Sequence, residues 1–483
     1  MDAQARHRST FVLITSAMVN VVLLAGILWL PFTDQFVGFL VILLMLGLMF
    51  SGVPVAVGMA VAGFVGILAI TGERAAATAM SGLAYDAVAS WSLSVLPLFI
   101  LMGMLVAESG LAMRVYDGAA AWLGWVPGGM AVTTTVAGAG LAATSGSTLG
   151  IVYAIGRSGI SEMLRKGYDH KLATGSVMVS GTLGQIIPPS ILLVIYAGIA
   201  QTSVGAQLMA GLVPGLLLTF LYIVLIVVAV VAKPDLVRYK GDERRPITFR
   251  ERARLTVALW PLPLLILVVL GGMLGGVFTA TEAAAGGAAC SVLILLVLRG
   301  HREFGPRFVQ SLKLTLTSGG SLFLLIIGTY ILGRAIAVSG LPRSLAAQLV
   351  SWGLSPWTFL VLVALLYLFL GTALEPLAML LITVPILLPA VIQYDISPLW
   401  FGIYAVLLGE LAVISPPVGV LVFIVHGIVS ERSIRQLRVI SLNDVYKGAL
   451  FFLPAPLLLA ALIIAFPDIV EWLPTLMSDQ SRS

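Results

Sequence analysis

The chain has 483 residues, of which 59% are hydrophobic and only 10% are charged. Because soluble globular domains carry roughly 25% charged residues, this composition excludes a single water-soluble core. The net charge of +5 comes from clusters of Arg and Lys. We interpret these clusters as the charge bias of cytoplasmic membrane loops and not as a nucleic-acid-binding surface.

Apolar runs recur from one end of the chain to the other, and each full-length run of about 20 residues can cross a bilayer. The runs lack the alternating pattern of a β-barrel. We therefore predict an all-α polytopic membrane protein. In chain order, the runs cover residues 11–31, 36–50 and 53–71, a glycine-rich block over about 92–230, and then 257–298, 314–338, 357–390, 397–429 and 449–466.

The runs divide the chain into five predicted segments. Residues 1–35 are an extra transmembrane helix, retained because no small-residue cleavage site follows its apolar run, with a cytoplasmic N-terminus. Residues 231–256 are strongly basic and form a cytoplasmic loop or surface helix. A first repeat over 36–230 and a second over 257–470 flank this segment, and 471–483 form a polar tail.

The two halves are related by an internal repeat. Three sequence pairs recur in the same order at similar offsets, which is unexpected by chance. They are Gly181-x-Leu183-x4-Pro188-Pro189 with Gly409-x-Leu411-x4-Pro416-Pro417 (offset 228), Ser109-Gly110-Leu111 and Trp122 with Ser339-Gly340-Leu341 and Trp352 (offset 230), and Tyr168-Asp169 with Tyr394-Asp395 (offset 226).

Each half also carries an early and a late stretch that breaks helices, at 145–148 and 181–190 in the first half and at 371–375 and 409–419 in the second. Non-helical backbone survives in a bilayer only where protein buries it or where it lines a wet cavity. Repeated halves with paired breaks therefore indicate a binding site near the midplane. The alternative is that the Ser and Gly residues of the breaks only let helices pack closely.

The chemistry of the breaks suits an ion and an organic acid. Freed carbonyls and hydroxyl groups are the oxygen ligands that sodium needs, and free amides at helix N-termini suit a carboxylate. The hydroxyl groups belong to Ser145, Ser147, Thr148, Ser190 and Ser415.

Three acids lie within apolar segments, where ionisable residues are costly and often functional. Glu282 follows Thr279 at the spacing of a capping box, so we interpret it as structural. Glu375, at the early break of the second half, has either a cation or substrate role or the role of a helix-start carboxylate. Glu410, beside the late break, is open to both interpretations.

No pattern indicates an enzyme or an organic cofactor. The four histidines (His7, His170, His301 and His426) lack metal-ligand spacing, and no phosphate-binding loop is present in the sequence. The single cysteine, Cys290, excludes disulfides within the chain. An ion gradient is therefore the expected source of energy.

At these motifs the chain resembles the large membrane subunit of tripartite ATP-independent periplasmic (TRAP) transporters, the DctM family. The resemblance covers about residues 36–466. The matching motifs are Leu96-Pro97-Leu98-Phe99-Ile100, Trp125-Val126-Pro127-Gly128-Gly129, Ser145-Gly146-Ser147, Gly167-Tyr168-Asp169, Gly181-Thr182-Leu183-Gly184, Ile187-Pro188-Pro189-Ser190, Ala210-Gly211-Leu212-Val213-Pro214-Gly215, Gly276-Val277-Phe278-Thr279-Ala280-Thr281-Glu282-Ala283, Trp400-Phe401-Gly402 and Ser415-Pro416-Pro417-Val418-Gly419.

The resemblance implies an elevator-type transporter with two inverted repeats, re-entrant helical hairpins and broken helices. It also implies Na⁺ as the coupling ion and two groups of site residues. The sodium ligands would come from Ser145, Gly146, Ser147, Gly181, Gly184, Ile187, Ser415 and Val418. The substrate would contact Ser147, Thr148, Pro189, Ser190, Thr372, Glu375, Pro416 and Pro417.

The resemblance further implies two protein partners, a small four-helix DctQ-like membrane subunit and a soluble periplasmic DctP-like binding protein. The predicted function is sodium-coupled import of a small carboxylate, such as a C4-dicarboxylate or a sugar acid, across a bacterial inner membrane. Two alternatives stay open. One is a stand-alone ion-coupled anion carrier that needs no binding protein, and the other is a membrane scaffold or channel without coupled transport.

Overall fold

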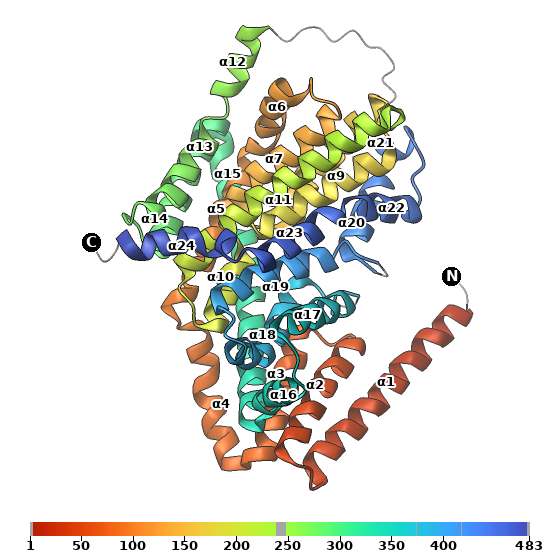
Figure 1. Cartoon of the computed structure of the whole chain (residues 1–483), viewed down its shortest axis with the longest axis vertical. Coiled ribbons are helices and arrows are strands. Elements are labelled where there is room, and N and C mark those ends of the chain that lie inside the picture. Colours follow the sequence, from red (N-terminus) through yellow and green to blue (C-terminus); the bar gives the residue numbers. More distant parts are fainter. Residues whose placement is uncertain (1–2, 238–247, 373, 417, 481–483) are drawn as a thin grey trace. The chain divides into compact units, whose positions relative to one another are not determined.

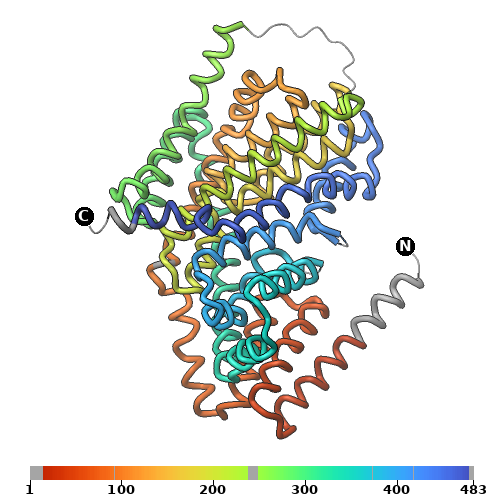
Figure 2. Tube along the Cα trace, in the orientation of Figure 1, coloured from red at the N-terminus to blue at the C-terminus, as the bar shows by residue number. Residues whose placement is uncertain are grey.

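The computed structural model describes residues 3–237, 248–372, 374–416 and 418–480 (Figure 1). These residues form helices and no strand, and the one bridge between extended residues pairs Tyr168 with Val237. The prediction of an all-α fold is confirmed. Figure 2 follows the same path as a continuous tube.

The helices of the first half are α1 (Ala3–Trp29), α2 (Asp34–Phe50), α3 (Val55–Thr71), α4 (Glu73–Val88), α5 (Val95–Ser109), α6 (Leu111–Leu123), α7 (Gly129–Ser145), α8 (Thr148–Arg165), α9 (His170–Thr182), α10 (Ile191–Ala200), α11 (Val204–Ala232) and α12 (Phe249–Val257). Those of the second half are α13 (Pro261–Ile266), α14 (Gly272–Leu274), α15 (Ala280–Ser339), α16 (Leu341–Ser351), α17 (Pro356–Leu370), α18 (Pro376–Gln393), α19 (Pro398–Ala412), α20 (Val420–Val429), α21 (Arg432–Arg435), α22 (Leu442–Phe452), α23 (Pro454–Ala465) and α24 (Asp468–Gln480). Short 3-10 or π turns are η1 (Trp91–Leu93), η2 (Leu183–Gln185), η3 (Pro234–Leu236) and η4 (Leu267–Gly271).

Several of these helices are long and apolar enough to span a membrane. Among the described residues five spans meet this test, and a sixth does if α5 and α6, bent by 68° at their junction, count as one. Shorter apolar helices of 10–17 residues, such as α2, α3 and α17, accompany them. The chain is thus a multi-pass membrane protein.

The fold divides into two compact units. The first comprises the chain up to Leu93 together with Ser318–Leu360 and Leu380–Pro398, and the second comprises Ser94–Thr317, Val361–Met379 and Leu399–Ser483. In the first unit, α1 docks on α2 through polar groups, because the Asn20 amide donates to Ser51 Oγ at 2.8 Å and Ser51 Oγ also lies 2.5 Å from Ser16 Oγ. Such interhelical hydrogen bonds hold helices together in lipid, where the hydrophobic effect cannot.

The second unit is built around α9, which packs against α7, α8 and α22. Glycine allows this close approach: a Cβ added to Gly175 would lie 2.5 Å from the carbonyl oxygen of Gly448 on α22. A Cβ on Gly138 of α7 would likewise lie 2.5 Å from the Cβ of Ser180 on α9. Small residues at these crossings are typical of membrane helix packing.

The structure repeats its local geometry where the sequence repeats. Helices α8 and α18 both have 18 residues and start at Thr148 and Pro376, an offset of 228. The two Ser-Gly-Leu corners also have the same hydrogen bonds, since Ser109 Oγ donates to Val106 O and Ser339 Oγ donates to Ile336 O, both at 2.7 Å. In each corner the glycine has positive φ.

One of the three predicted sequence pairs has the wrong register. The turn that ends α8 places Gly167 at φ 78°, and the turn that ends α18 places Asp395 at φ 54°. Both turns are closed by the same pair of backbone hydrogen bonds, so Gly167 corresponds to Asp395 at an offset of 228. The Tyr168-Asp169 and Tyr394-Asp395 match, at 226, is therefore a coincidence of residue type.

The structure adds detail to two further expectations. In the segment predicted as a polar tail over 471–483, helix α24 continues as far as Gln480. Separate runs were also predicted over 257–298 and 314–338, and α15 accordingly consists of two helices that meet between these runs at Gly300, whose φ of 70° is not helical. Much of the basic segment, residues 238–247, lies outside the described residues.

Candidate ion and substrate site at four helix breaks

The early break of the first repeat separates α7 from α8. Helix α7 ends at Ser145, and Gly146 takes up the left-handed conformation at φ 57° that favours glycine. Ser147 then caps α8, since its Oγ accepts a hydrogen bond from the Gly150 amide at 3.2 Å. The Oγ of Ser145 is buried and has no hydrogen-bond partner among the described residues.

The late break of the first repeat separates α9 from α10. After Thr182 the chain forms the short turn η2 and then a cis Pro188–Pro189 bond. Ser190 caps α10 by accepting from the Leu193 amide at 3.2 Å and donates its own hydroxyl to the carbonyl oxygen of Gln185. The side-chain Oε1 of Gln185 is buried and, like Ser145 Oγ, lacks a partner among the described residues.

These two breaks pack directly on each other. A Cβ added to Gly146 would overlap the carbonyl oxygen of Pro189. A Cβ on Gly184 would lie 3.1 Å from the carbonyl oxygen of Ser147, and one on Gly181 would lie 3.0 Å from that of Thr148. Glycine at these positions therefore lets the non-helical backbone of α7–α8 contact that of α9–α10.

The breaks of the second repeat pack in the same manner. A Cβ on Gly371, just after α17, would overlap that of Ala412, the last residue of α19. A Cβ on Gly409 would lie 3.2 Å from the Cβ of Pro376, the first residue of α18. Because Gly409 and Pro376 correspond to Gly181 and Thr148 at an offset of 228, the contact between breaks is itself repeated.

The second repeat differs in its polar groups. Ser415 donates its hydroxyl to Leu411 O at 2.6 Å, and the Val418 carbonyl accepts from the Tyr446 hydroxyl. Glu375 is exposed, whereas Thr372 is half-buried and Pro416 exposed. Pro417 lies outside the described residues.

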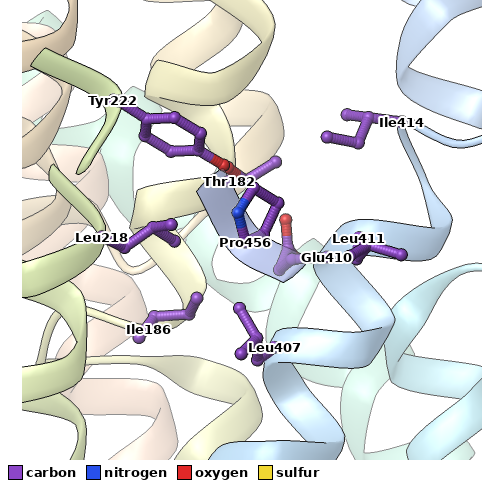
Figure 3. Close-up of a pocket in the computed structure, with 9 residues that line it drawn as sticks. All are labelled: Thr182, Ile186, Leu218, Tyr222, Leu407, Glu410, Leu411, Ile414 and Pro456. Atoms are coloured by element: carbon purple, nitrogen blue, oxygen red, sulfur yellow. The ribbon is translucent and has the colours of Figure 1, made fainter. Parts of the chain in front are cut away.

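The four breaks belong to the second unit, so the structure brings the predicted site residues that it describes into one compact body. A hydrogen bond joins the early break of the first repeat to the late break of the second: Thr148 Oγ1 donates to Glu410 Oε2 at 3.0 Å. Figure 3 shows the pocket that contains Glu410, and the lining residues are Thr182, Ile186, Leu218, Tyr222, Leu407, Glu410, Leu411, Ile414 and Pro456.

Sequence reasoning left Gln185 out of the candidate site and left Glu410 undecided. Gln185 had a usable signal, because it is the one amide side chain between Gly184 and the Pro-Pro pair. For Glu282, the capping box is confirmed, since Glu282 Oε2 accepts from the Thr279 amide at 2.9 Å and the Thr279 hydroxyl accepts from the Glu282 amide.

The breaks of the first repeat contain two side-chain oxygen atoms that have no hydrogen-bond partner among the described residues. A buried polar atom without a partner destabilises a fold by about 1–3 kcal/mol, so such atoms often mark the place of a ligand. The orphaned oxygens of Ser145 and Gln185 lie in adjacent breaks of one repeat. The described residues have no group of three or more His, Cys, Asp or Glu that could hold a metal ion.

A multi-pass helical chain with repeated halves and paired helix breaks belongs to the class of membrane transport proteins. More specifically, the chain belongs to the family of the DctM component of tripartite ATP-independent periplasmic transporters, whose family model matches residues 42–469. The resemblance seen in the sequence is confirmed over nearly its whole range. Helix α1 lies outside the matched residues.

Individual relatives agree with this assignment. The C4-dicarboxylate TRAP transporter large permease protein DctM of Vibrio cholerae is 32% identical over 462 residues, which cover 91% of this chain and 97% of the relative. The sialic acid TRAP transporter large permease protein SiaM of the same species is 29% identical over 433 residues, covering 89% and 97%. The solved structure of the Neisseria gonorrhoeae transporter MtrF has a similar fold, with a TM-score of 0.57 at 11% identity over 90% of this chain and 96% of that chain.

Proposed function

We propose that this chain is the large permease subunit of a sodium-coupled, binding-protein-dependent importer of small organic acids. The observation that carries the proposal is the gathering of four helix breaks in one unit of a DctM-family chain. The relatives named for C4-dicarboxylates and for sialic acid both act on carboxylates, which supports an organic acid as cargo.

Sodium is transported cargo in this proposal, and the first repeat has the better evidence for a sodium site. Ser145 Oγ and Gln185 Oε1 are neutral oxygens without a hydrogen-bond partner in the described part of the chain, and a cation bound at these breaks would give them one. In this proposal, backbone carbonyl groups at Gly146, Gly181, Gly184 and Ile187 would complete the set of oxygen ligands. In the second repeat, Ser415 keeps its oxygen lone pairs available because its hydroxyl acts as a donor.

The carboxylate would lie between the helix starts that follow the breaks. The caps Ser147 and Ser190 stand at the N-termini of α8 and α10, where backbone dipoles favour an anion. Thr148 and Pro189 border these helix starts, Thr372 and Pro416 lie at the two breaks of the second repeat, and Glu375 would set the local charge. Movement of the second unit with its cargo would give an elevator mechanism.

The proposed machine has two further proteins, a DctQ-like four-helix membrane subunit and a DctP-like soluble binding protein in the periplasm. The chain itself would lie in a bacterial inner membrane with a cytoplasmic N-terminus. The first experiment uses proteoliposomes that hold this chain and its small membrane partner. Uptake of labelled succinate and of labelled sialic acid is followed under an inward sodium or potassium gradient, with and without the binding protein.

The proposal predicts uptake only when sodium and the binding protein are both present. Uptake driven equally by sodium and potassium would refute sodium coupling. Sodium-driven uptake without the binding protein would favour a stand-alone organic-anion carrier.

The sodium site has its own test in Ser145→Ala. We expect this change to raise the sodium concentration for half-maximal uptake severalfold, because it removes an oxygen ligand. The matched control is Ser291→Ala on α15, a fully buried serine whose hydroxyl donates to Gly287 O at 2.9 Å. Equal effects of the two changes on the sodium dependence would remove Ser145 from the site.

A further inference from the structure

Glu410 is an acid buried in the second unit, with a side chain only 2% exposed. The pocket beside it is lined largely by aliphatic side chains (Figure 3). Burying a carboxyl group with few hydrogen bonds is costly in a membrane protein, and acids kept at such places usually have a role. The sodium and substrate assignments above do not use Glu410.

The hydrogen bonding of Glu410 is directed at the other repeat. The described hydrogen bond of its carboxyl group comes from the Thr148 hydroxyl, 262 positions away in the chain. Thr148 is the first residue of α8 and directly follows the break at Gly146 and Ser147. Its own carbonyl oxygen packs on Gly181 of the late break.

The residue next to Glu410 contacts the other helix start. Gly409 packs against Pro376, the first residue of α18, which corresponds to Thr148 in the second repeat. Two consecutive residues of α19 thus contact the first residues of the two equivalent helices α8 and α18. A shift of the start of α8 or of α18 would therefore displace the same turn of α19.

The repeat itself does not require an acid at this place. At an offset of 228, Glu410 corresponds to Thr182, whose hydroxyl donates to Val179 O of its own helix at 2.8 Å. Thr182 also lies 3.5 Å from the Tyr222 hydroxyl. The first repeat thus forms the equivalent helix end with a residue whose side chain bonds within its own repeat.

We propose that Glu410 is a positioning residue that couples the early break of the first repeat to the late break of the second through its hydrogen bond with Thr148. The hydrogen bond fixes the position of the start of α8 relative to the end of α19. An ion bound at one of the two breaks therefore favours the ion-bound geometry of the other break. This inference rests on the proposed sodium-coupled function, but the contact between the repeats has a test of its own.

The test is a double-mutant cycle with Thr148→Val and Glu410→Met, which remove the donor and the acceptor with little change in size. Proteoliposome uptake of labelled succinate or sialic acid is measured against sodium concentration. We expect each single change to raise half-saturating sodium about tenfold, because a buried hydrogen bond is lost and its partner left unsatisfied. The half-saturating sodium concentration of the double variant should not exceed that of the more impaired single variant.

Conservative variants separate this role from others. Thr148→Ser and Glu410→Gln keep a hydroxyl donor and an oxygen acceptor, and they should restore half-saturating sodium to within about twofold of the original value. Loss of function in Glu410→Gln equal to that in Glu410→Met would overturn the proposal, because it would mean that the carboxyl group itself is needed. A merely structural contact would lower the maximal rate and leave half-saturating sodium unchanged, which would also overturn it.

The thermal unfolding of the purified chain tests the contact without transport. The same cycle should show that the two single changes are not additive in the unfolding temperature. Additive changes would refute the link between the repeats. If the unmodified protein takes up acids without any need for sodium, the proposed function fails, and the unfolding cycle still decides whether Thr148 and Glu410 act as a pair.

Discussion

Replacing Gly146 by alanine adds one methyl group at the point where the two breaks of the first repeat meet. Two costs combine there. At φ 57° the backbone is left-handed, which destabilises a residue with a Cβ by about 1–2 kcal/mol. The added Cβ would also overlap the carbonyl oxygen of Pro189, and overpacking of this kind costs about 1–3 kcal/mol. The expected total is about 2–5 kcal/mol.

Gly276→Ala is the matched control for this change. Gly276 has φ 66°, but among the described residues no atom beyond its chain neighbours lies within 4 Å of the position of its added Cβ. It should therefore show the backbone strain of about 1–2 kcal/mol and no steric overlap. The assay is thermal unfolding of the purified protein in one detergent at one heating rate, because membrane proteins often unfold irreversibly.

We expect Gly146→Ala to lower the unfolding temperature clearly more than Gly276→Ala, and to reduce sodium-driven uptake as well. Equal shifts of the unfolding temperature would refute the close contact between Gly146 and Pro189. A stable Gly146→Ala variant with full uptake would refute the role of the break in the site.

Three further changes test other contacts. Gly371→Ala should destabilise the second repeat by about 1–3 kcal/mol because its Cβ would overlap that of Ala412. Gly319→Ala is the control, since no described atom lies within 4 Å of its added Cβ, and equal unfolding temperatures of the two variants would contradict the overlap. Asn20→Ala should weaken the packing of α1 on α2 by about 0.5–2 kcal/mol, because the hydrogen bond to Ser51 is lost, and so speed protease cleavage of α1. Met18→Ala, at an exposed residue, is the control, and equal cleavage of the two variants would contradict the docking of α1. Arg307→Ala should lower the unfolding temperature at low salt, because Arg307 forms ion pairs with Glu108 and Glu303 at 3.0 Å each. The difference in unfolding temperature from the unmodified protein should shrink at high salt, and a difference that salt does not change would contradict a role of the ion pairs.

The helix breaks were predictable because their causes are local. Glycine, proline and capping serine act on their own few residues of backbone, so the positions near Gly146, Pro188, Gly371 and Gly419 could be found without any tertiary contact. The repeat was predictable for the same reason. Its Ser-Gly-Leu corners form the same short hydrogen bonds in both halves.

The errors came from features that residue types alone do not decide. Tyr and Asp recur by chance, whereas the turn that ends α8 and α18 requires a residue that tolerates positive φ, which glycine and aspartate both do. The bond between Thr148 and Glu410 joins residues 262 positions apart, so no local pattern could pair them. The orphaned oxygen of Gln185 depends on which groups surround it, and this too is a tertiary property.

The duplicated Ser-Gly-Leu corners have a consequence for natural variation. Their backbone is the same, but a Cβ at Gly110 would meet the guanidinium of Arg299, whereas one at Gly340 would meet no atom within 4 Å in the part of the chain that the structure describes. Arg299 is bound to this corner through the Glu108 carbonyl at 3.1 Å. A substitution that the protein tolerates at Gly340 is therefore not expected to be tolerated at Gly110. After a duplication, the two copies inherit the same local geometry and then accumulate different mutations according to their separate neighbours.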